Sequence, residues 1–79
     1  MNYKDHIVAD KHICGGEAIL KGTRVTLRTL LASLAEGDEI ATILKDYPSL
    51  TEEHVRAAIA FAADSARDDF PVPETPKVA

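Results

Sequence analysis

The side chains best suited to chemistry stand near the N-terminus, where His12 and Cys14 are two residues apart. Residues at this spacing in a strand share a face, so a thiol with a histidine base beside it could act as a nucleophile. Nothing nearby suggests a pocket, an oxyanion hole or a third group that would orient the histidine. We therefore expect a non-enzymatic protein in which Cys14 is a small thiol beside a turn.

A metal site needs three or four ligands at usable spacing. His6, His12 and Cys14 could converge only if a hairpin placed them together, and no carboxylate stands out as a fourth ligand. The glycines around Lys21-Gly22-Thr23 lack the order of a phosphate-binding loop and the helix that directly follows one. We expect neither a metal nor another cofactor.

Basic side chains are concentrated in the first third of the chain. Residues 1–28 hold five Lys and Arg against three acids, whereas residues 29–79 hold four against ten, within a net charge of −4. An anion-binding face is therefore expected in the first third, unless these are scattered solvated charges. The guanidinium of Arg24 could bind a phosphate, or equally a carboxylate or carbonyl of its own fold. If DNA is bound, we expect Lys21, Arg24 and Arg28 to contact it.

A short β-hairpin is expected to carry these residues. Residues 3–9 read as a strand, Gly15-Gly16 is a turn signal, and residues 18–20 form a second apolar run. Three helices are predicted to follow. Their apolar residues recur at helical spacing, first at Leu27, Leu30, Leu31 and Leu34, then at Ile40, Ile43, Leu44 and Tyr47, and finally at Val55, Ala58, Ile59 and Ala62.

Capping residues mark the ends of these helices. Thr26 and Thr51 are predicted N-caps of the first and third helices, and Asp38 is the predicted N-cap of the second. Gly37 suits the end of the first helix, and Pro48 stops the second. The short links force neighbouring helices together, so the second and third have the outline of a helix-turn-helix.

The third predicted helix is apolar nearly all round, which indicates burial on more than one side. Its start carries Glu52 and Glu53, which phosphates would repel, so we interpret it as core plus protein interface. Ile59 is assigned to the core, and Ile59→Ala is expected to cost about 2–5 kcal/mol. The alternative is an over-apolar core helix in a monomer. The predicted dimer or partner interface consists of Arg56, Ala57, Ala60 and Phe61.

The chain has room for one domain, assigned to residues 1–67, followed by a Pro-rich flexible tail over residues 68–79. The predicted fold class is mainly α: a tri-helical, helix-turn-helix or winged-helix-like bundle with a short N-terminal β-hairpin. A single cysteine fits a reducing compartment, and neither a membrane span nor a signal peptide is visible. We expect a cytoplasmic protein that does not enter the membrane.

The order of three segments resembles a known family. These are the runs Ile13–Val25 (ICGGEAILKGTRV), Ile43–Thr51 (ILKDYPSLT) and Val55–Ala62 (VRAAIAFA). They are similar to the domain of unknown function 433 family, the VapB-like antitoxins, over about residues 5–66.

The resemblance implies a dimeric tri-helical protein with a short β segment. It also implies an antitoxin that binds and neutralises a PIN-like nuclease toxin and could repress its own operon by binding promoter DNA. A homodimeric protein-interaction module with no nucleic-acid function is the alternative, suggested by the Ala-rich third helix and the acidic second half of the chain.

Overall fold

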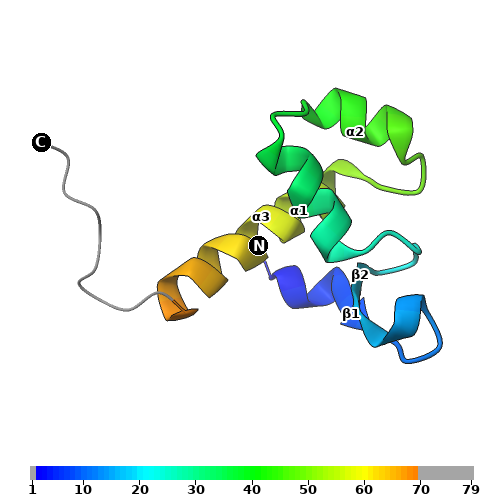
Figure 1. The fold of residues 1–79 in the computed structure, drawn as a ribbon, viewed down its shortest axis with the longest axis vertical. Helices are drawn as coiled ribbons and strands as arrows, with labels where there is room; N and C mark the ends of the chain where they lie inside the picture. Colours follow the sequence, from blue (N-terminus) through cyan, green and yellow to red (C-terminus); the bar gives the residue numbers. More distant parts are fainter. Residues whose placement is uncertain (1, 70–79) are drawn as a thin grey trace, which may run out of the picture.

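The computed structural model describes residues 2–69, and Figure 1 shows their arrangement. A 3-10 turn η1 (Tyr3–Asp5) precedes strand β1 (Ile7–Ala9), and a second turn η2 (Cys14–Gly16) precedes strand β2 (Ala18–Leu20). Helices α1 (Leu27–Ala35), α2 (Ile40–Asp46) and α3 (Glu52–Asp69) follow. The predicted combination of a short hairpin with three helices is confirmed.

The two strands pair antiparallel, with Val8 opposite Ile19 at the centre of the register. The turn between them takes the left-handed conformation at Cys14, Gly15 and Gly16, with φ of 51°, 67° and 87°. Glycine reaches this region without steric cost, which explains the Gly-Gly pair. The expected single strand over residues 3–9 is wrong in its first half, because the Asn2 side chain accepts from the Lys4 amide at 3.1 Å and caps η1.

Helix α1 has the predicted ends. The Thr26 hydroxyl accepts a hydrogen bond from the Thr29 amide at 3.1 Å, as an N-cap does. At the other end, Gly37 has φ of 94°, and its amide donates to the Leu34 carbonyl. The Asp38 amide donates to the Ser33 carbonyl, which completes a Schellman motif.

The predicted N-cap at Asp38 is wrong, because Asp38 belongs to the end of α1 and α2 begins at Ile40. Glu39 stands at the cap position and makes no side-chain capping bond. Helix α3 begins after the predicted cap Thr51 and continues to Asp69, two residues past the predicted domain end. The rest of the predicted tail, from residue 70 onward, lies outside the described residues.

The core is small and aliphatic. It forms where α1 meets α2, α3 and β2, while α3 also contacts η1 and β1. Its buried members are Leu20, Leu27, Leu30, Ile43, Leu50, Val55 and Ala58. Over residues 2–69, no helix combines the length and apolar character that crossing a membrane requires.

Candidate functional site

The Lys21–Arg24 turn joins the hairpin to α1 and is held by its own hydrogen bonds. Thr23 is only 7% exposed, and its hydroxyl donates to the Leu20 carbonyl at 2.8 Å and accepts from the Val25 amide at 3.0 Å. Gly22 has φ of 83°, a conformation that favours glycine. Thr23 and Gly22 therefore shape the turn, which leaves Lys21 and Arg24 as its exposed side chains.

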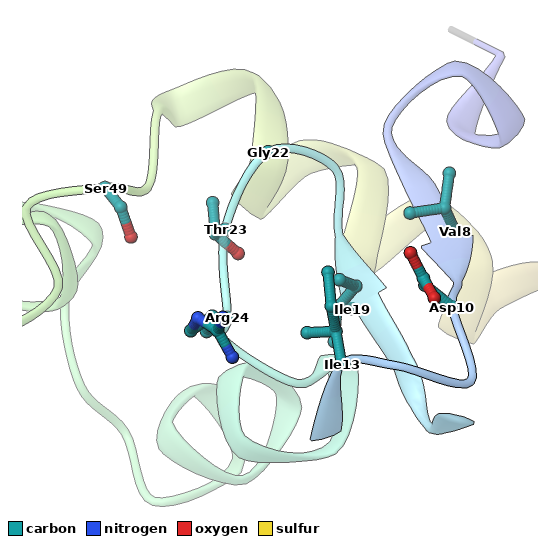
Figure 2. Close-up of a pocket in the computed structure, with 8 residues that line it drawn as sticks. All are labelled: Val8, Asp10, Ile13, Ile19, Gly22, Thr23, Arg24 and Ser49. Atoms are coloured by element: carbon teal, nitrogen blue, oxygen red, sulfur yellow. The ribbon is translucent and has the colours of Figure 1, made fainter. Parts of the chain in front are cut away.

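An open hollow of about 650 Å³ lies beside this turn, and Figure 2 shows the side chains that line it. Val8, Ile13 and Ile19 supply its apolar lining. In Figure 2, Arg24 lies on one side of Ile13 and Ile19 and Asp10 lies on the other side, with Val8, so the hollow carries one charge of each sign. The Asp10 carboxylate also accepts from the His12 amide at 2.8 Å, which holds the start of the hairpin loop.

Two of the three predicted DNA-contacting residues, Arg24 and Arg28, line different hollows. Arg24 lines the hollow, whereas Arg28 lies on α1 beside a separate groove. The Arg28 guanidinium donates to both carboxylate oxygens of Glu17, at 3.2 and 3.1 Å. This bidentate pair offsets the charge of Arg28 and reduces its pull on a phosphate. Lys21 and Arg24 are both exposed and lie three residues apart on the same turn.

The separate groove runs between α1 and α3 and has a volume of about 570 Å³. Its walls are mostly apolar, with the Glu17–Arg28 pair at the rim. The lining consists of Glu17, Ala18, Leu27, Arg28, Leu31, Ala32, Ala35 and Phe61. The Tyr3 ring packs against Phe61 in a T-shaped arrangement, with ring centroids 5.6 Å apart. Phe61 is the only predicted interface residue in this groove.

The remaining predicted interface residues lie on different sides of α3. Arg56 is exposed and Ala60 is half-buried. Ala57 is 0% exposed, so its assignment to the surface is wrong for the single chain. Ile59 is 47% exposed, so its assignment to the core is also wrong. The face of α3 that packs inward therefore includes Ala57 and does not include Ile59.

His54 links the start of α3 to the Lys21–Arg24 turn, a role that the sequence analysis missed. Its Nδ1 accepts from the Thr51 amide at 3.0 Å, while the Thr51 hydroxyl accepts from the His54 amide at 3.3 Å. This reciprocal arrangement is that of a capping box, with histidine in place of Glu or Gln. Because Nδ1 accepts, Nε2 carries the proton and donates to the Lys21 carbonyl at 3.0 Å. The sequence pattern that could have predicted this capping box is a Thr followed three residues later by a polar side chain.

The residues first considered for chemistry are not assembled into a reactive group. The Cys14 thiol donates to the Arg24 carbonyl at 3.2 Å and so ties the hairpin loop to the following turn. His12 is exposed. Within the described chain, no three His, Cys, Asp or Glu side chains come close enough together to hold a metal ion.

Comparison with known proteins identifies the family. A family model described as protein of unknown function (DUF433) matches residues 7–62, and the chain belongs to this family. The uncharacterized protein y4eO of Sinorhizobium fredii is 32% identical over 59 residues, which are 75% of this chain and 27% of that protein.

A solved structure supports the same assignment. The crystal structure of a DUF433 member protein from Anabaena variabilis shares 29% identity with a TM-score of 0.70, over 82% of this chain and 64% of that one. The chain thus spans about a quarter of y4eO and under two thirds of the Anabaena protein.

Proposed function

We propose that this protein is an antitoxin-like binding module that holds a PIN-like nuclease toxin against the groove between α1 and α3. The apolar lining of that groove is the observation that carries the proposal. The half-buried Leu31 and Phe61 present a hydrophobic surface above the buried Leu27. The small exposed side chains of Ala32 and Ala35 leave room for side chains of a partner. Apolar side chains of a partner helix suit such a groove.

Charge supports a nuclease as the partner. An enzyme that cleaves RNA must attract a polyanion, so its substrate surface is expected to be basic. Helix α1 ends beside the groove at Ala35, and the exposed acids Glu36, Asp38 and Glu39 follow immediately. These carboxylates would face basic groups around a bound nuclease and speed its capture.

Inhibition of RNA cleavage tests the proposal. The proposal predicts a PIN-like nuclease gene beside this one, and the nuclease it encodes is purified and titrated with this protein and with two matched variants, Ala32→Arg and Ala41→Arg. Both alanines are exposed on helices, but only Ala32 lines the groove. We expect inhibition by the native chain, a loss of at least about 30-fold in affinity for Ala32→Arg, and no change for Ala41→Arg. Equal inhibition by both variants would exclude the groove, and no inhibition by the native chain would exclude the function.

Operator binding is a second candidate function, favoured by Lys21 and Arg24. Both are exposed on one turn, and within residues 2–69 the Arg24 side chain has no hydrogen bond or ion pair. Helix α3 is a poor base reader, because Glu52 and Glu53 open it and would repel phosphates.

A gel-shift titration against the protein's own promoter checks this second function. Binding should weaken with roughly one power of salt concentration for each phosphate contacted. Arg24→Ala should reduce both the affinity and that slope, whereas Arg28→Ala, which removes a paired charge, should have the smaller effect. Absence of binding at low salt, with and without the nuclease, would rule out this function.

A further inference from the structure

The outward face of α3 combines a large apolar side chain with small ones. Among the described residues, Ile59 is the one large hydrophobic side chain that is exposed. Ala63 and Ala66 are exposed near it, and Ala60 is half-buried. Ile59 and Ala63 are four residues apart, so they share a face of the helix. The result is a continuous apolar strip and not a single exposed side chain.

This strip is separate from the groove. The buried residues Ala57 and Ala58 and the groove residue Phe61 define the inward side of the middle of α3, whereas Ile59 points away from them. The second half of α3, yellow to orange in Figure 1, extends beyond α1 and the hairpin. Another chain could therefore approach this half without meeting the other helices.

An exposed ion pair within the helix stands at each end of the strip. Near the start, Glu52 (56% side-chain exposure) accepts from Arg56 at 2.7 Å. Near the end, Arg67 (76%) donates to Asp64 at 3.0 Å. A second copy laid parallel would place like charges side by side. A copy laid antiparallel would place Glu52 of each chain opposite Arg67 of the other, and the midpoint between these residues falls between Ile59 and Ala60.

We propose that two copies of this chain associate through the outward faces of their α3 helices, antiparallel, with a two-fold axis between Ile59 and Ala60. Each Ile59 then packs on the small side chains of the partner helix, and two Glu52–Arg67 pairs close the ends. The face is self-complementary, as a two-fold interface requires. Large-against-small packing at the axis lets the helices approach closely.

Sedimentation velocity over a range of protein concentrations tests the association. The native chain should dimerise at micromolar concentration. Ile59→Arg should raise the dimer dissociation constant by at least about 30-fold, and the matched exposed variant Ala41→Arg should leave it unchanged. Because Ile59 is exposed, circular dichroism should show that the variant folds. A native chain that stays monomeric, or a dimer indifferent to Ile59→Arg, would overturn the proposal.

A charge-exchange experiment tests the antiparallel direction. Glu52→Lys alone and Arg67→Glu alone each place like charges opposite one another twice per dimer, so each should raise the dissociation constant by about tenfold. In an equimolar mixture of the two variants, the mixed dimer has opposite charges at both ends and should form with near-native affinity. Failure of the mixture to restore association would reject this geometry. The test needs no nuclease and is independent of the proposed antitoxin activity.

Discussion

His54 forms hydrogen bonds with two residues that are far apart in the sequence, so it does more than cap a helix. It satisfies the Thr51 amide at the start of α3 and reaches the Lys21 carbonyl, 33 residues earlier. Its ring also lies 6.3 Å from that of His6, centroid to centroid. One side chain therefore joins the β segment to the longest helix.

Removing this ring should destabilise the fold without opening the core. His54→Ala leaves the Thr51 amide and the Lys21 carbonyl without their partner, and we expect a loss of about 1–2 kcal/mol in the free energy of unfolding. Urea denaturation followed by circular dichroism measures the change. The exposed His12 is the control, and His12→Ala should change stability by less than about 0.5 kcal/mol. Equal effects of the two variants would show that the His54 contacts contribute nothing.

The corrected orientation of α3 reverses the expectation for Ile59. Because this side chain is 47% exposed, Ile59→Ala should cost less than about 1 kcal/mol at protein concentrations too low for association. Leu30 is 0% exposed, so Leu30→Ala should cost about 2–5 kcal/mol. Thermal and urea unfolding of both variants check this order. A larger loss of unfolding free energy for Ile59→Ala than for Leu30→Ala would show that Ile59 is a core residue after all.

Among the structural elements, the junction between α1 and α2 depends most on a single backbone conformation. Gly37 has φ of 94°, and open space surrounds the position where a Cβ would stand. Gly37→Ala should therefore cost about 1 kcal/mol or more through backbone strain alone. Gly37→Asn should cost less, because asparagine tolerates left-handed conformations better. Chemical denaturation of both variants separates backbone strain from steric crowding. Crowding would lower the free energy of unfolding more for Gly37→Asn, because asparagine is the larger side chain.

Local signals predicted the ends of the elements well. Thr26, Gly37 and Thr51 act through backbone groups within a few residues, so their roles are visible in a short stretch of sequence. The error at Asp38 has a local cause as well. The Schellman motif at the end of α1 uses the Asp38 amide, so the next helix begins two residues later.

The orientation of α3 and the groove could not be predicted in the same way. Between Ala57 and Ala63 almost every residue is apolar, so periodicity does not distinguish a face with Ala57 inside from one with Ile59 inside. The groove exists only after α1, β2 and α3 have packed. The second partner of His54 and the Glu17–Arg28 pair also join residues that short-range patterns do not connect.

For the molecule as a whole, α3 separates the two proposed binding surfaces. The groove lies on its inward side and the strip around Ile59 on its outward side, so one protein should be able to bind a nuclease and a second copy of itself together. Ala32→Arg should weaken nuclease inhibition while leaving the dimer intact. Ile59→Arg should do the reverse.

Light scattering of each variant, alone and mixed with the nuclease, measures both properties in one experiment. The native chain should form a complex that contains two copies of each protein. Loss of both properties in either variant, with the fold retained, would show that the two surfaces are coupled.

The contacts of the Lys21–Arg24 turn also bear on the order in which the chain folds. The Thr23 bonds and the Thr26 cap close loops of three residues or fewer, so they can form early. The bond from His54 to Lys21 must wait until distant segments meet. We therefore expect Thr26→Ala to slow refolding and His54→Ala mainly to accelerate unfolding, a difference that stopped-flow kinetics would resolve. In kinetic terms, the contact between His54 and Lys21 forms after the folding transition state, so it prolongs the lifetime of the native state.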